Sequence, residues 1–174
     1  IEADNVFALR INGTFDDCQD LVKQAFIQRD FLKPDQYLLA VNSINWTRIV
    51  GQICYYFYAY NRLANHQNLN FSIPTGNFGN VFACYSAFKM GLPIKTISVA
   101  VNDNDILHRF FASNDYSKKQ VHETISPSMD ISVASNFERL VYDFFLDRST
   151  AQCAELFNNF PNQGIELDEA TWSK

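Results

Sequence analysis

Positive charge is scarce in this sequence. Its 14 lysine and arginine residues face 19 aspartate and glutamate residues, which leaves a formal net charge of −5. Non-specific binding to nucleic acids or anionic membranes needs a basic face, so the composition argues against both. The longest apolar run, residues 49–60, is shorter than a membrane span of roughly 20 residues and contains Gln52. We therefore expect a cytoplasmic protein that contacts neither nucleic acid nor membrane.

Cysteine and histidine are scarce as well. The four cysteines lie far apart, include no C-x-x-C pair and fall in apolar helical patterns. We expect buried free thiols rather than disulfides or metal ligands. His66, His108 and His122 share no spacing typical of a metal site or a catalytic triad, so we expect solvent-facing side chains. The sequence thus predicts no metal site.

Short apolar runs alternate with segments of helical spacing along the chain. Hydrophobic residues make up 47% of the sequence, which is typical of a globular protein. Strands are predicted at residues 5–11, 37–41, 71–74 and 95–101. Helices are predicted around residues 18–26, 49–65, 81–88, 106–111, 140–145 and 151–160. This alternation predicts the α/β class, a parallel sheet with helices on both faces, in which ligands sit beyond the carboxyl ends of the strands.

Two of only six glycines lie in the stretch PTGNFGN, Pro74–Asn80, between a predicted strand and a predicted helix. Glycine permits a positive φ and a close ligand approach, and the first helical turn offers unpaired N–H groups. Together these features favour a phosphate cradle without a basic side chain, to which Thr75 and Asn77 add donors. A tight turn before a capped helix remains the alternative. The stretch matches neither a Walker A motif nor G-x-G-x-x-G.

Other polar residues lie where predicted helices begin. Ser43, Asn45 and Arg48 either meet a substrate phosphate or form a helix cap with a surface arginine. Asn102 and Asp105 either face a ligand or cap a helix, and Ser135 with Glu138 predicts a capping box. Asp130, Asn136 and Arg139 either order a loop near the site or support the fold, and we favour support of the fold. Arg109 is left open between an acidic partner and a phosphate. These candidates are, in sequence order, Ser43, Asn45, Arg48, Asn102, Asp105, Arg109, Asp130, Asn136 and Arg139.

Several stretches, taken in order, resemble the threonine synthases of bacteria and fungi. Each motif is modest alone, but their order and spacing make the resemblance specific over residues 5–145. The stretches are GTFDDCQ (13–19), VNSINWTRI (41–49), PTGNFGN (74–80), NDNDILxRF (102–110), SPSMDI (126–131) and SNFER (135–139).

The resemblance implies an enzyme of fold type II among the pyridoxal-phosphate enzymes. Threonine synthases convert O-phosphohomoserine and water to threonine and phosphate. It implies that Gly76, Asn77, Phe78, Gly79 and Asn80 hold the cofactor phosphate. Many relatives have Asp where this chain has Asn80, and losing a carboxylate beside a phosphate is not expected to weaken binding.

One feature of the family is missing from this sequence. The lysine that forms a Schiff base with the cofactor lies in an F-K-D context on the N-terminal side of the matched stretches. Lys89, the only superficial match, falls on the wrong segment and is interpreted as a cation at a helix C-terminus. Because the chain also begins at Ile1, we interpret residues 1–174 as one α/β piece without the N-terminal lysine-bearing domain and a C-terminal part. We expect this piece to be inactive alone.

Two other functions remain open. One is a threonine-synthase-like protein that binds phosphorylated ligands without catalysis, and the other is a generic phosphate-ester or nucleotide-binding module. The aromatic run Tyr55–Tyr58 is interpreted as core, but surface around Tyr55–Tyr60 that would meet a missing domain predicts self-association.

Overall fold

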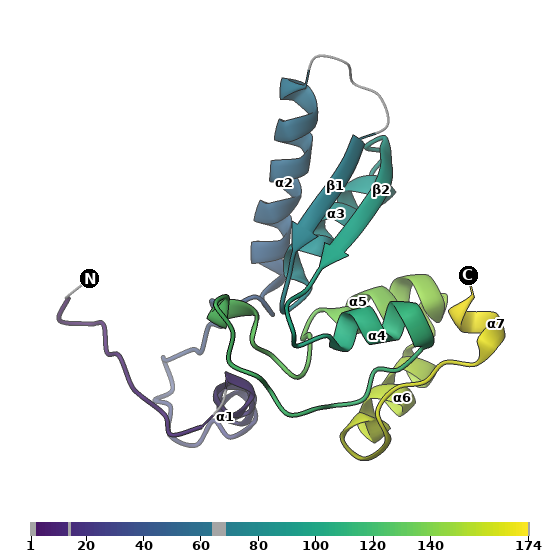
Figure 1. Ribbon diagram of the computed structural model, residues 1–174. Helices are drawn as coiled ribbons and strands as arrows, with labels where there is room; N and C mark the ends of the chain where they lie inside the picture. The colour runs from purple at the N-terminus through teal and green to yellow at the C-terminus, as the bar shows by residue number, and fades with distance from the viewer. Residues whose placement is uncertain (1–2, 14, 64–68, 174) are drawn as a thin grey trace. The chain divides into compact units, whose positions relative to one another are not determined.

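A strand–helix–strand segment positions the loop from Gly76 to Asn80, called the glycine loop below. In the computed structural model, which describes residues 3–13, 15–63 and 69–173, β1 (Leu69–Pro74) and β2 (Ile94–Ala100) pair in parallel. α3 (Gly79–Lys89) connects the two strands and ends before Gly91, whose φ of 98° suits glycine. The fold class is α/β, as predicted from the alternating pattern. Because Pro74 lies opposite Ala100, both strands end at one edge of the sheet, where α4 and α5 follow (Figure 1).

The chain divides into two compact units, residues 1–40 and 41–174. The first unit contains α1 (Phe15–Ile27), where the predicted helix lies, and otherwise irregular segments. The predicted cap Thr14 lies outside the described residues. The second unit contains β1, β2 and every residue of the candidate site.

The remaining elements of the second unit are helical. α2 (Trp46–Arg62) buries Ile49, Ile53 and Tyr56 and packs against α3. The others are α4 (Ile106–Ser113), the 3₁₀ turn η1 (Pro127–Met129), α5 (Phe137–Leu140), the π-helical turn η2 (Val141–Phe145), α6 (Thr150–Gln163) and α7 (Glu169–Trp172). All six predicted helices are confirmed, and α7 is a further short helix that the sequence did not predict.

One face of the sheet carries the core. Leu69, Phe71 and Ile73 alternate with exposed neighbours on β1, and the Phe71 ring meets Tyr56 of α2 edge-on at 5.0 Å. Beyond the strand ends an aromatic cluster surrounds Phe110 of α4, with Phe137 at 4.8 Å between ring centroids. The sheet and this cluster therefore share one continuous core.

Two predicted strands are wrong. Residues 5–11 and 37–41 are irregular, and among the described residues they pair with neither β1 nor β2. Most of their apolar side chains are exposed, 85% for Leu9 and 89% for Tyr37. A strand needs a neighbour for its backbone N–H and C=O groups, and an apolar pattern does not supply one.

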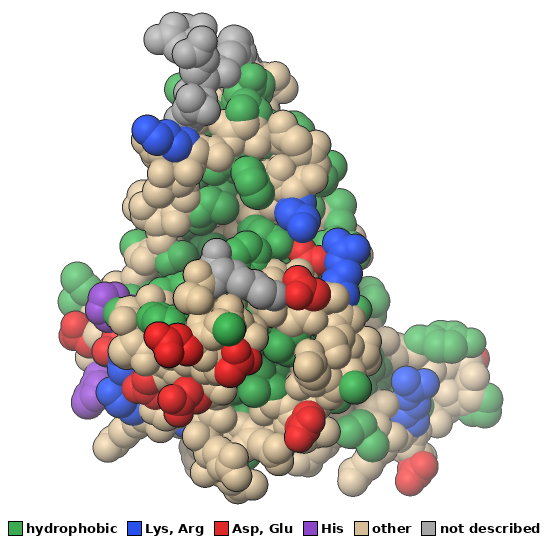
Figure 2. All heavy atoms as spheres, turned by 90° about the vertical axis from the view of Figure 1, so that its right-hand side faces the viewer, with side chains coloured by type: hydrophobic (Ala, Val, Ile, Leu, Met, Phe, Trp, Pro, Cys, Tyr) green, Lys and Arg blue, Asp and Glu red, His purple; other side chains and the backbone are tan. Residues whose placement is uncertain are grey.

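The surface corrects two further expectations. Cys84 and Cys153 are buried free thiols, as predicted, but Cys54 is exposed on the outer side of α2. Tyr56 belongs to the core, whereas Tyr55 and Tyr58 point outward on the same helix. Self-association through these tyrosines stays a prediction. Figure 2 shows acidic side chains gathered on the lower part of one face, a charge that does not favour a polyanionic partner.

Candidate functional site

The glycine loop leaves the end of β1 and turns directly into α3. The Thr75 N–H donates to the Ala100 carbonyl at 2.9 Å, which continues the strand pairing by one residue. The turn is made by Phe78, whose φ of 62° is left-handed, and Gly76 and Gly79 have no positive φ. The expectation that the glycines supply the positive φ is therefore wrong. The buried Phe78 ring packs edge-on against Phe137, which offsets the strain at this position.

The glycines are needed for close approach instead. A Cβ atom on Gly76 would lie 3.1 Å from the Met129 Cα and 3.3 Å from the Ser128 carbonyl oxygen, so the η1 turn packs directly on the loop. A Cβ on Gly79 would lie 3.4 Å from Ile49 Cδ1, which is an ordinary contact with a side chain that can adjust. Gly76 is therefore the more constrained of the two.

The first turn of α3 has no side-chain cap. Its N-cap residue is Phe78, whose side chain cannot accept a hydrogen bond, so the first N–H groups from Gly79 onward lack the usual side-chain capping partner. These groups carry the partial positive charge of an eleven-residue helix. Such N–H groups suit an anionic ligand such as a phosphate monoester, and α3 has no side-chain cap of the kind that the alternative predicts.

The two asparagines of the loop anchor it from both sides. The Tyr56 hydroxyl hydrogen-bonds to the Asn80 side-chain oxygen and, at 2.9 Å, to the Asn80 carbonyl. Burial raises the pKa of Tyr56, which keeps this donor protonated. Asn77 accepts from the Ser135 hydroxyl at 3.3 Å. The Asn80 side-chain oxygen thus ties the loop to α2, and the Asn80 backbone N–H belongs to the uncapped turn.

Asn136 joins three distant segments. Its side-chain amide is fully buried and donates to the Ser43 carbonyl at 3.0 Å and to the Asn77 carbonyl at 3.1 Å. It accepts from Arg139, which donates to the Ile44 carbonyl at 2.9 Å and lies over the Trp46 ring. Asn136 and Arg139 therefore support the fold, as predicted, and do so at the loop itself.

The capping box predicted at Ser135 and Glu138 is not formed. The N-cap of α5 is Asn136, and it makes no side-chain cap bond because its side-chain oxygen accepts from Arg139 Nε instead. Ser135 turns toward the glycine loop instead. Tertiary partners have replaced the local cap.

The candidates Ser43, Asn45 and Arg48 gather before and at the start of α2. Asn45 is the N-cap and accepts from the Thr47 N–H at 2.9 Å. Arg48 is exposed and donates to the Val41 carbonyl at 2.7 Å. Only Ser43 is tied to the glycine loop, through the shared amide of Asn136. Asn45 thus caps α2 and Arg48 lies at the surface, and a contact of either residue with a substrate phosphate stays a prediction.

Arg109 is held by acids, which resolves the alternative left open. Its guanidinium contacts the Asp105 carboxylate at 2.9 Å and the Asp115 carboxylate at 2.5 Å, and it donates to the Ser117 carbonyl. Asp105, at the N-cap of α4, makes no side-chain cap bond because it pairs with Arg109. These ion pairs fix the irregular segment after α4 to the helix.

The Asp115 pair predicts acid sensitivity. Hydrogen bonds from Ser117 and from Arg109 lower the pKa of Asp115 to about 2. Because the folded pKa lies below the unfolded value, the pair stabilises the protein fully above about pH 4 and ever less as pH falls toward 2. Urea unfolding of wild type and Asp115→Asn should show a stability gap at pH 5 that narrows by pH 2.5. A gap independent of pH would contradict this assignment.

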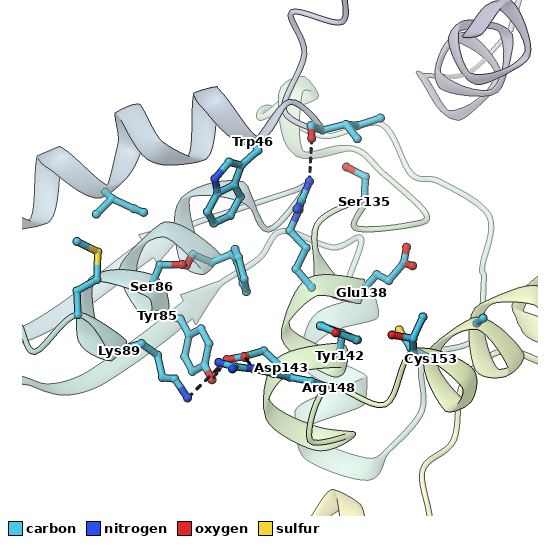
Figure 3. A pocket seen from close by; sticks show the side chains of 17 residues that line it. Trp46, Tyr85, Ser86, Lys89, Ser135, Glu138, Tyr142, Asp143, Arg148 and Cys153 are labelled. Atoms are coloured by element: carbon cyan, nitrogen blue, oxygen red, sulfur yellow. Dashed lines mark hydrogen bonds and ion pairs between the residues drawn. The ribbon is translucent and has the colours of Figure 1, made fainter. Parts of the chain in front are cut away.

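A cavity of about 740 Å³, lined in part by Arg139, lies between α2, α3, α5 and α6. Figure 3 shows Tyr85, Lys89 and Arg148 converging on Asp143 at one side of it. The Asp143 carboxylate accepts from Tyr85 at 2.8 Å and Arg148 at 2.7 Å, and Lys89 lies 3.6 Å away. Partial burial raises the pKa of Asp143, but these hydrogen bonds outweigh it and hold the pKa below its ordinary value.

The sequence did not predict this cluster, since its two halves, Tyr85 with Lys89 and Asp143 with Arg148, lie more than 50 positions apart and share no motif. It settles the nature of Lys89, which sits in the last turn of α3 and pairs with Asp143, as expected of a helix C-terminal cation. Of the histidines, His108 and His122 are exposed as predicted and His66 lies outside the described residues. Within the described ranges, His, Cys, Asp and Glu side chains form no group of three or more that suits a metal ion.

Comparisons with known proteins support a cofactor site. The family described as "Pyridoxal-phosphate dependent enzyme" matches residues 3–159. The threonine synthase of Pseudomonas aeruginosa is 49% identical over 100% of this chain and 37% of its own length. The threonine synthase of Saccharomyces cerevisiae is 42% identical over 90% of this chain and 32% of its own length.

The solved structures that resemble this chain are also those of threonine synthases. The crystal structure of pyridoxal-phosphate-bound threonine synthase from Brucella melitensis matches with a TM-score of 0.83 and 45% identity, over 97% of this chain and 36% of the other. The chain thus spans about a third of the length of the relatives it matches. The residues quoted for the resemblance, from GTFDDCQ to SNFER, lie within the matched family range.

Proposed function

Because the chain belongs to the pyridoxal-phosphate dependent enzymes, we propose that the loop from Gly76 to Asn80 binds the phosphate of pyridoxal phosphate. The observation that carries this proposal is the uncapped first turn of α3, directly after a loop that the fold holds from two sides. The N–H groups of a helix start suit a dianionic phosphate without a basic side chain. When bound, the cofactor supplies an electron sink that stabilises negative charge on a substrate carbon atom.

The activity of the whole protein is proposed as that of a threonine synthase. Relatives of that name cover essentially the whole chain at 42–49% identity. On this proposal the substrate is O-phosphohomoserine, the products are threonine and phosphate, and the protein acts in the cytoplasm. Within the described ranges no helix is both long and apolar enough to cross a membrane. We keep Ser43, Asn45 and Arg48 as proposed substrate contacts. Ser43 has the strongest support, because its carbonyl and the Asn77 carbonyl of the glycine loop accept from the same Asn136 amide.

The amine that holds the cofactor aldehyde is proposed to come from outside these residues. Lys89, the one candidate, is committed to Asp143 at the far end of α3 from the loop. We therefore expect the 174-residue chain to form no threonine by itself. Its proposed part in the reaction is to bind and orient the cofactor phosphate.

Binding of pyridoxine 5′-phosphate by calorimetry tests the loop directly. This probe keeps the phosphate and lacks the aldehyde, so surface lysines cannot react with it. We expect saturable binding that is at least about tenfold tighter than that of pyridoxine, which is about 1.4 kcal/mol for the phosphate contacts. Equal affinity for the two compounds, or no saturable binding, would contradict the proposal.

Three glycine-to-alanine variants should differ in how much they weaken binding of pyridoxine 5′-phosphate. Gly76→Ala should weaken phosphate-dependent binding about tenfold and leave it measurable, because its Cβ displaces backbone of the η1 turn. Gly79→Ala meets ordinary contacts and should have a smaller effect. Gly51→Ala is the matched control: nothing lies within 4 Å of its Cβ on exposed α2 surface, so binding should be unchanged. That control should also be more stable by about 0.5–1 kcal/mol, because alanine favours the helix.

A further inference from the structure

We infer that Asp130 is a positioning residue for the glycine loop, holding the η1 turn in place against Gly76. The inference rests on the proposed function of that loop and adds a residue that acts on it from about 50 positions away in the sequence. The starting observation is the contact at Gly76, where a Cβ would lie 3.1 Å from the Met129 Cα. The position of η1 therefore limits where the loop can lie.

Asp130 is the C-cap residue directly after η1, and both oxygens of its carboxylate accept hydrogen bonds. Oδ1 accepts from the Asn102 amide at 2.7 Å, the Thr124 hydroxyl at 2.7 Å and the Asn104 amide at 3.1 Å. Oδ2 accepts from the Thr124 N–H at 2.9 Å. Hydrogen bonds to an ionised acceptor are about twice as strong as neutral ones. The hydrogen bond from Thr124 lowers the pKa of Asp130, so the carboxylate is charged at neutral pH.

Two of the donor residues lie just after the end of β2. Asn102 and Asn104 follow Ala100, the last residue of that strand. The Asn104 amide also holds the His122 carbonyl at 2.9 Å, and Asn102 donates to the Ser126 hydroxyl at 2.9 Å. The whole stretch from His122 to Asp130 is thereby fastened to one strand end.

The glycine loop is fastened to the neighbouring strand end. β1 runs beside β2, and the Thr75 N–H bonds to the Ala100 carbonyl just before Gly76. The glycine loop is thus attached to the end of β1, and the η1 turn is attached to the end of β2 by the hydrogen bonds of Asp130. The loop and the η1 turn contact each other at Gly76. Because the pairing of the strands is fixed, the Asp130 carboxylate sets how far η1 reaches over the loop.

The test compares Asp130→Asn with Asp103→Asn, which removes a charge from an exposed residue of the same strand-end segment. The first readout is amide hydrogen exchange of a peptide covering residues 75–82. Asp130→Asn should speed exchange there and leave that of α6 unchanged, and Asp103→Asn should change neither. Faster exchange throughout the chain would show a merely structural role, and unchanged exchange in the loop would overturn the inference.

The second readout is affinity for pyridoxine 5′-phosphate in a double-mutant cycle. Asp130→Asn should weaken binding about tenfold in the wild-type background and much less in the Gly76→Ala background, because that variant has already pushed η1 away from the loop. Equal losses in both backgrounds would overturn the inference. If the wild type binds no probe, the proposed function fails, and hydrogen exchange still decides the role of Asp130.

A milder variant guards against misfolding. Thr124→Val removes one hydroxyl donor to Asp130 at nearly constant volume. If Asp130→Asn does not fold, Thr124→Val should show the same local rise in exchange at residues 75–82, in smaller measure. An unchanged loop in a folded Thr124→Val protein would overturn the inference.

Discussion

Asn136→Ala is expected to lower the free energy of unfolding by about 3 kcal/mol and to abolish phosphate-dependent binding at the glycine loop. The side chain is fully buried and makes hydrogen bonds with Ser43, Asn77 and Arg139. Its removal leaves the Ser43 carbonyl and the Arg139 Nε–H without this partner, and each such buried group costs about 1–3 kcal/mol. The Asn77 carbonyl keeps only the backbone N–H of residue 136.

Urea unfolding followed by circular dichroism measures the first effect, and calorimetry with pyridoxine 5′-phosphate measures the second. Asn70→Ala is the matched control, because Asn70 is an exposed asparagine on β1. We expect its stability to stay within about 0.5 kcal/mol of wild type. A stable Asn136→Ala protein with intact binding would show that the loop does not depend on this amide.

Phe110→Ala is expected to have the largest effect on stability, a loss of about 4 kcal/mol in the free energy of unfolding. Phe110 is fully buried, and its ring contacts those of Phe137 and Phe145 at centroid distances of 4.8 and 5.5 Å. A large cavity would remain, because the surrounding rings come from several different elements and cannot all close in. Phe137 follows Asn136 directly, so the loop support should loosen as well.

Phe111→Ala is the matched control for this prediction. Phe111 is the next residue of α4 and is 42% exposed, so the same truncation removes much less buried surface. We expect it to cost about 1 kcal/mol, which thermal and urea unfolding resolve from the loss at Phe110. Similar losses for the two variants would mean that the cluster does not centre on Phe110.

The sequence predicted the strand–helix–strand framework around the loop well. The apolar run ending at Ile73, the helical stripe after Gly79 and the strand before Val101 are local patterns, and each also has a partner within the chain. It failed for residues 5–11 and 37–41, whose patterns are just as clear. A strand is completed by hydrogen bonds to a neighbour, and the alternation of apolar side chains says nothing of whether that neighbour is present.

By itself the sequence determined the fold class, the place of the loop and the family, because motifs and periodicity are properties of neighbouring residues. Only the tertiary structure decided why the loop has its form. Position 76 requires glycine because the Met129 backbone lies close to it. Phe78 adopts the left-handed conformation because its ring packs against Phe137. Ser135 donates to Asn77 and does not cap α5. These contacts join residues roughly 50–60 positions apart, and such pairs leave no periodic signal in the chain. The physical reason is that a buried polar or strained group is stabilised by whatever packs against it, which folding alone brings together.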